Sequence, residues 1–192
     1  MNEKTKPNLF AIATKELSQD GFLAWLLKWA NPNNKQYDKS LNACAQDFVK
    51  YLIKKDLEIE SVDVCFQWKK IDICAYVNDK YLIIIEDKTF SGDNNPLESY
   101  KKKAENLCNM NKIEPICIYL RTGTEKSPQK SIEEKGFRYI SRGDLIKFFE
   151  KPEYKKIKND IYLDFIKNLE NTFPQRKNKL EEILLEKMLG IS

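Results

Sequence analysis

The sequence contains no histidine. This absence removes the most common general base, the most common zinc ligand and every Ser-His or Cys-His nucleophile pair. Any catalysis by this chain must therefore depend on carboxylates, lysines, tyrosines or a metal ion.

Cysteine is scarce, and the five cysteines, Cys44, Cys65, Cys74, Cys108 and Cys117, include no CxxC pair. Because they lie among apolar residues and are odd in number, we expect buried free thiols rather than disulfides or a zinc site. Long apolar runs are also missing. The longest has about five residues, whereas a membrane helix needs ~20 and a signal peptide ~7 to 15. We expect a cytoplasmic protein without a membrane partner.

The composition is that of a folded protein with a charged surface. Apolar residues make up 42% of the 192 residues and charged residues 32%. This length predicts a single domain over residues 1–192. The net charge of +4 permits a nucleic-acid partner but does not require one.

Hydrophobic periodicity predicts helices, then a meander of strands, then a helix, a strand and further helices. The expected helices are 14–30, 39–55, one that opens at Asn94 or Asn95, 142–151, 154–173 and 177–189. The expected strands are 58–68, 70–77, 81–90, 114–122 and 137–141, with a polar loop over 123–131. This order indicates an α/β fold with a mixed sheet and helices on both faces.

The stretch "YLIIIEDKTF" ends an apolar strand with charged residues. Glu86 and Lys88 share one strand face, and Asp87 points to the other. If residues 78–80 form a three-residue loop, Asp72 of the preceding strand falls directly opposite Glu86. A two-residue loop would place Asp72 and Glu86 on opposite faces.

Two opposed carboxylates lie close enough to share a divalent cation, and oxygen ligands suit Mg²⁺ or Mn²⁺. A neighbouring lysine can orient a water, help to deprotonate it or stabilise charge on a phosphate, so the group suits phosphodiester hydrolysis. The alternative is a charged strand edge with cross-strand salt bridges and no catalytic role. The E-x-K pattern recurs at Glu133 and at Glu153, but only Glu86 ends an apolar strand next to a second strand that carries an aspartate.

The segments "IDI" and "IIIEDKT", with "TKELSQDGFLAWLLKWANP" upstream, resemble the PD-(D/E)XK nuclease superfamily, over about residues 10–121. The resemblance implies a restriction-endonuclease-like mixed central sheet flanked by helices, with extra C-terminal helices over about 142–192. It also implies that Asp72, Glu86 and the Asp87 carbonyl bind the metal and that Lys88 serves the attacking water. A helical glutamate, matched best by Glu16 and alternatively by Asp20, joins the metal ligands. Glu16 can equally be a residue that complements the helix dipole.

The chain departs from the pattern of the family at two positions. Ile71 stands where the name of the family has proline. Related members carry a glutamine four residues before a tyrosine on the next helix, and this chain has Pro96 before Tyr100. Asn94 or Asn95 supplies the missing amide, or substrate handling is altered, or the site is degenerate.

These residues predict a nuclease that cleaves DNA with Mg²⁺ or Mn²⁺. The lysines near the cluster are expected to contact phosphates, and with Tyr100 the candidate nucleic-acid contacts are Lys69, Lys70, Tyr100, Lys101 and Lys102. A lysine run can also be an ordinary solvated face. Two alternatives are an RNA nuclease with the same residues and an inactive module that binds nucleic acid or protein. The segment 177–189 either packs on the domain or forms a homodimer.

Overall fold

The computed structural model describes residues 7–13, 15–88, 97–123, 129–170 and 188. These residues form helices and strands in an order close to the predicted one. The helices are α1 (Leu9–Ile12), α2 (Glu16–Trp29), α3 (Lys39–Ile53), α4 (Leu97–Asn111), α5 (Gln129–Glu134), α6 (Arg142–Phe149) and α7 (Asp160–Glu170), with 3-10 turns η1 (Pro32–Gln36) and η2 (Pro152–Tyr154). The strands are β1 (Val62–Trp68), β2 (Ile71–Val77), β3 (Tyr81–Lys88), β4 (Glu114–Arg121) and β5 (Arg138–Ser141).

The strands form one mixed sheet in the order β1-β2-β3-β4-β5. Strands β1, β2 and β3 are antiparallel neighbours, which confirms the predicted meander, and β3, β4 and β5 run parallel. The parallel part places the carboxyl ends of β3, β4 and β5 at the same edge of the sheet, where β2 begins.

The turn between β2 and β3 sets the register that the site depends on. Val77 pairs with Tyr81 across a three-residue loop, which is the one of the two loop lengths considered that brings Asp72 and Glu86 to the same face. Asn78 and Asp79 both have positive φ, 52° and 53°, and asparagine and aspartate tolerate the left-handed conformation better than most residues. The Lys80 N–H closes the turn on the Val77 carbonyl at 3.0 Å.

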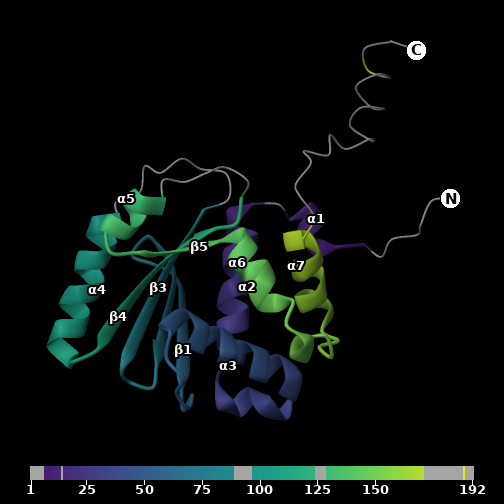
Figure 1. Cartoon of the computed structure of the whole chain (residues 1–192), viewed down its shortest axis with the longest axis horizontal. Coiled ribbons are helices and arrows are strands. Elements are labelled where there is room, and N and C mark those ends of the chain that lie inside the picture. The colour runs from purple at the N-terminus through teal and green to yellow at the C-terminus, as the bar shows by residue number, and fades with distance from the viewer. Residues whose placement is uncertain (1–6, 14, 89–96, 124–128, 171–187, 189–192) are drawn as a thin grey trace.

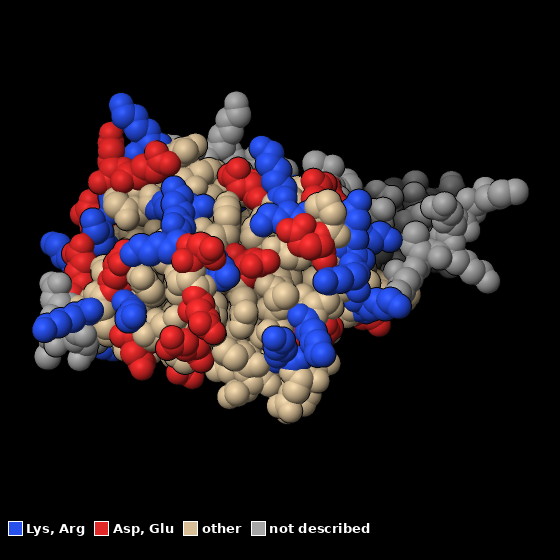
Figure 2. All heavy atoms as spheres, turned by 60° about the horizontal axis from the view of Figure 1, so that its bottom comes forward, with Lys and Arg blue, Asp and Glu red and all other residues tan. Residues whose placement is uncertain are grey.

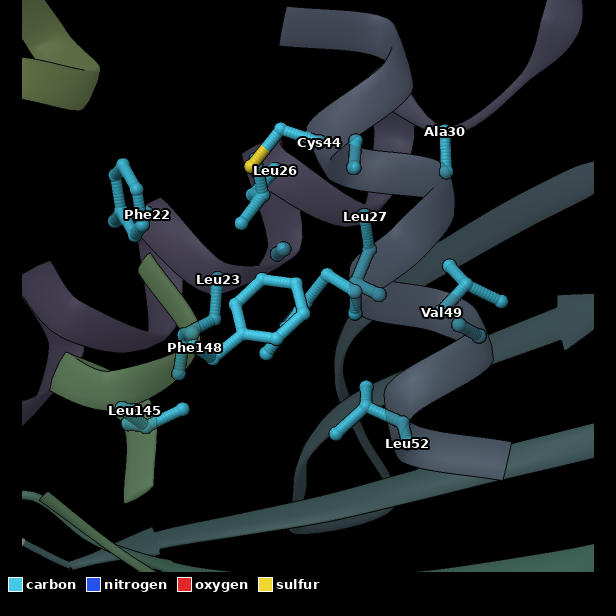
Figure 3. Close-up of a cluster of buried hydrophobic side chains, with 14 of the residues drawn as sticks. Phe22, Leu23, Leu26, Leu27, Ala30, Cys44, Val49, Leu52, Leu145 and Phe148 are labelled. Atoms are coloured by element: carbon cyan, nitrogen blue, oxygen red, sulfur yellow. The ribbon is translucent and has the colours of Figure 1, made fainter. Parts of the chain in front are cut away.

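Helices cover both faces of the sheet (Figure 1), which confirms the α/β prediction. One face packs against α2, α3, α6 and α7 and contains the larger core. The other packs against α4 and α5 in a smaller cluster. Figure 3 shows part of the larger core, where α2, α3 and α6 direct apolar side chains toward one another. The rings of Phe22 and Phe165 stack with centroids 3.6 Å apart, so α7 shares this core.

Local signals explain where helices begin. The Asp38 side chain accepts hydrogen bonds from the first N–H groups of α3, and Ser141 and Asp144 form a reciprocal capping box at α6. Such caps satisfy N–H groups that lack an intrahelical partner. Helix α2 has no side-chain cap at Lys15, and Glu16 is the acidic residue of its first turn.

Some expectations were wrong in detail. Cys65 is exposed, although the other four cysteines are buried. It lies on the edge strand β1, whereas α4 packs on β3 and β4. The segment expected as a polar loop contains the start of α5, and the segment 154–173 forms η2, a connection and α7.

Two expectations fall mainly outside the described residues, namely the helix start at Asn94 or Asn95 and the helix 177–189. Within the described part of the chain, no helix has the length and apolar character needed to cross a membrane.

Candidate active site

The ends of β2 and β3 bring the predicted acidic residues together. The paired register ends with Ile73 and Ile85, and Asp72 and Glu86 are the next residues of the two strands beyond that pair. The Asp87 N–H donates a 3.0 Å hydrogen bond to Oδ2 of Asp72, which fixes the Asp72 carboxylate beside β3. The three-residue turn therefore places Asp72 where the sequence analysis expected it.

Lys88 lies among three carboxylates from three different elements. Its Nζ is 3.0 Å from Oε1 of Glu86, 3.8 Å from Oδ2 of Asp72 and 4.0 Å from Oε2 of Glu16. Helix α2 packs across β1, β2 and β3 and so carries Glu16 to this point. Glu86 and Lys88 are buried, with 2% and 8% of their surfaces exposed, so solvent screens these contacts only weakly.

Asp87 points to the face covered by α2, as strand alternation predicts. Its Oδ1 accepts a 3.1 Å hydrogen bond from the hydroxyl of Thr122, directly after β4. The Thr122 N–H also donates to the Lys88 carbonyl at 3.2 Å. Asp20 of α2 is buried nearby, and the charge of Asp87 raises its pKa. Among the described residues, neither Oδ1 of Asp20 nor Oδ2 of Asp87 has a hydrogen-bond partner.

This excess of buried acid shifts the pKa values of the site. Burial, followed by the charges of Asp87 and Asp72, raises the pKa of Asp20 to about 9. Burial also raises the pKa values of Glu86 and Asp87 to about 7 and, in direction, that of Asp72. Burial alone would lower the pKa of Lys88, but the charges of Glu86 and Asp72 outweigh it and raise that pKa. Lys88 is therefore an ammonium ion here.

Comparison with known proteins identifies the family. The model of the PD-(D/E)XK nuclease superfamily matches residues 7–186. The chain belongs to this superfamily. The match extends well beyond the 10–121 core that the sequence analysis assigned to the resemblance, and it includes α6 and α7. Searches of curated proteins and of solved structures give no match.

The donor set fits the divalent metal that is typical of PD-(D/E)XK nucleases. Carboxylate oxygens suit Mg²⁺ and Mn²⁺, and Mg²⁺ usually keeps several waters and binds through one or two carboxylates. Over the described residues, however, no three acidic or cysteine side chains are grouped closely enough to enclose an ion. The Lys88 ammonium lies between the carboxylates instead. The carboxylates available to a metal are thus those of Asp72 and Glu86, and Glu16 lies near them, 4.0 Å from Lys88. That the Asp87 carbonyl is also a ligand stays a prediction.

The residues predicted to contact nucleic acid lie in two parts of the fold, the β1–β2 hairpin and helix α4. Lys69 and Lys70 form the exposed tip of the β1–β2 hairpin, next to the start of β2. Tyr100 of α4 is buried, and its pKa is raised by burial and then by the charges of Glu86 and Asp72, so its hydroxyl approaches the site. Lys102 is exposed. Lys101 instead extends toward Gly136 and pairs with Glu105 at 3.7 Å.

Two features of the site were not anticipated. Thr122 supports the Glu86–Lys88 segment from β4, but a parallel register between distant strands leaves no local signal in the sequence. Lys103 joins the hairpin tip to α4, because its Nζ donates to the Lys69 carbonyl at 3.5 Å. A signal for Lys103 was present in the lysine run 101–103, but the helix alone does not show which lysine faces the hairpin. The Pro96 position lies outside the described residues.

Proposed function

We propose that this protein is a metal-dependent nuclease that hydrolyses phosphodiester bonds of DNA with Mg²⁺ or Mn²⁺. The observation that carries the proposal is the position of Lys88, within 4.0 Å of carboxylates of Glu16, Asp72 and Glu86 at one edge of the sheet. Membership of the PD-(D/E)XK nuclease superfamily supports phosphodiester hydrolysis as the reaction class.

In this proposal Asp72 and Glu86 hold the metal, the Asp87 carbonyl adds a ligand, and Glu16 contributes directly or through water. The ion supplies Lewis-acid stabilisation of phosphate charge and a more acidic water. Asp20 is the alternative to Glu16. Asp20 is buried behind β3, next to Asp87, so Glu16 is the better placed of the two residues to reach the metal.

Lys88 acts at the attacking water and the phosphate. As an ammonium it donates hydrogen bonds, so in this state it orients the water and stabilises the negative charge that develops on the phosphate oxygens. Metal binding would neutralise part of the charge of Asp72 and Glu86, and the pKa of Lys88 would then fall toward a range where it can also exchange a proton.

A cleavage assay tests the proposal. Purified protein is incubated with supercoiled plasmid, linear duplex, single-stranded DNA and RNA, each with Mg²⁺, Mn²⁺ or EDTA. We expect metal-dependent cleavage of DNA that Asp72→Asn abolishes. The matched control is Asp63→Asn, since Asp63 is an exposed aspartate on the neighbouring strand β1 and should be dispensable.

Each other outcome identifies a different function. Cleavage of RNA alone would assign the same residues to a ribonuclease. Binding of nucleic acid in EDTA without cleavage under any condition would identify an inactive binding module. Cleavage that persists in Asp72→Asn would show that the catalytic centre lies elsewhere.

A further inference from the structure

A groove is lined by residues of α4 and by Lys135, directly after α5. Its volume is about 610 Å³. Its polar lining residues are Glu98, Ser99, Lys102, Lys103, Asn106 and Lys135. Three ammonium groups therefore face one carboxylate, so the groove is suited to an anionic ligand.

Lys103 connects this groove to the candidate active site. It lines the groove, its Nζ lies 5.4 Å from the centroid of the Tyr100 ring, and it donates to the Lys69 carbonyl. Tyr100 in turn belongs to the same buried cluster as Ile71, which precedes Asp72, and Ile84, two residues before Glu86. Lys103 thus links the groove, through the Tyr100 ring, to the face of the sheet against which α4 packs.

The hairpin tip extends the same basic surface on the other side of Lys103. Lys69 and Lys70 have φ values of 50° and 73°, which are left-handed conformations that favour glycine or asparagine. Lysine at both positions therefore costs backbone energy, and such strain is often found at functional sites. The Nζ of Lys69 lies over the Trp68 ring at 4.6 Å, which helps to hold the tip.

We propose that the α4 groove and the hairpin tip form one phosphate track, which binds the backbone of the DNA strand that flanks the scissile phosphate. The inference rests on the proposed function and extends it by naming the surface that holds the substrate. Lys102, Lys103 and Lys135 contact successive phosphates as point charges, and Ser99 and Asn106 add neutral donors.

The groove part of the track contacts the backbone rather than the bases. None of the described residues that line the groove is aromatic, whereas base-stacking sites depend on aromatic side chains. The contacts are therefore electrostatic and independent of sequence, and they should weaken steeply with salt. Figure 2 shows one face of the molecule, the bottom of Figure 1 turned forward, where acidic and basic side chains are interspersed.

The test is equilibrium binding of a short fluorescent duplex and of the matching single strand, measured in EDTA at several salt concentrations. The double variant Lys102→Ala/Lys135→Ala is compared with Lys28→Ala/Lys80→Ala. The control removes the same charge from two exposed lysines, one near the end of α2 and one in the β2–β3 turn, at the opposite end of β2 from Asp72. Thermal melts of both variants verify that the fold is kept.

We expect the groove variant to bind at least about tenfold more weakly and to lose about 0.9 of the logarithmic salt slope for each lysine that contacts a phosphate. The control should bind as the wild type does. An unchanged salt slope in the groove variant, or equal losses in both variants, would overturn the track. The binding measurement needs no metal, so it separates failure of the track from failure of catalysis. If the protein binds DNA through the groove but does not cleave it, the phosphate track stands and the proposed nuclease activity is wrong.

Discussion

The Nζ of Lys88 lies 3.0 Å from Oε1 of Glu86, two residues earlier on the same strand. The contact follows from the alternation of β3, and it means that an ammonium group occupies the position among these carboxylates where a cation is needed. Lys88 therefore competes with a divalent metal for the same oxygens, while catalysis is proposed to need both.

Lys88→Met separates these two roles. Methionine keeps an apolar stem of similar length but removes the charge, so Asp72 and Glu86 become more available to a metal. We expect Mn²⁺ binding by calorimetry to be as tight as in the wild type or tighter, while DNA cleavage falls by about 10²- to 10⁴-fold. Weaker metal binding together with full cleavage would contradict the assignment.

Thr122→Val tests the support that β4 gives to the site. The substitution keeps the shape but removes the hydroxyl that donates to buried Asp87 at 3.1 Å. Leaving a buried acceptor without its donor should lower the free energy of unfolding by about 1 to 3 kcal/mol, measured by denaturant titration. Thr122→Ser keeps the hydroxyl and should lower the free energy of unfolding much less. A valine variant as stable as the wild type would show that the hydrogen bond contributes little.

Asp20 should make the metal-free protein less stable as the pH rises. Its pKa is about 9 in the folded chain, against an ordinary value of 3.8. Between these values the folded chain retains a proton that the unfolded chain has released. The stability that the protonated Asp20 carboxyl gives to the folded chain is therefore fully present below about pH 4 and is lost as the pH rises toward about 9.

Asp20→Asn cannot ionise, so its stability in EDTA should fall less steeply over the same window. We expect a difference in slope of up to about 1 kcal/mol per pH unit, seen in thermal melts from mildly acidic to alkaline buffer. The control is Asp63→Asn, which changes an exposed aspartate on β1 and should follow the wild type. Parallel curves for Asp20→Asn and the wild type would disprove a role for Asp20 in this pH dependence.

Local sequence patterns predicted most of the fold. The apolar spacing of α2 and α3 and the short apolar runs of β2 and β3 are signals that neighbouring residues carry, so their type and approximate bounds were predictable. The antiparallel register depends on the length of the loop after Val77, which the sequence left open between two and three residues, and the structure has the three-residue loop. The helix α5 was missed, since its short polar sequence has a single buried residue, Ile132, and thus no periodic face.

The sequence by itself determined the chemistry that this protein can use. The absence of histidine, the two strands that carry Asp72 and Glu86, and the lysine two residues later define a carboxylate site beside an ammonium group. These features were predictable because strand alternation and a short hairpin act over neighbouring residues.

Only the tertiary structure decided what surrounds that site. It carried Glu16 to within 4.0 Å of Lys88, placed Thr122 against Asp87 and directed Lys103 to the hairpin tip. It also left Cys65 exposed on the edge strand. Each of these contacts joins residues far apart in the chain or depends on how helices pack across the sheet, and packing between distant elements is set by the whole core rather than by any local pattern.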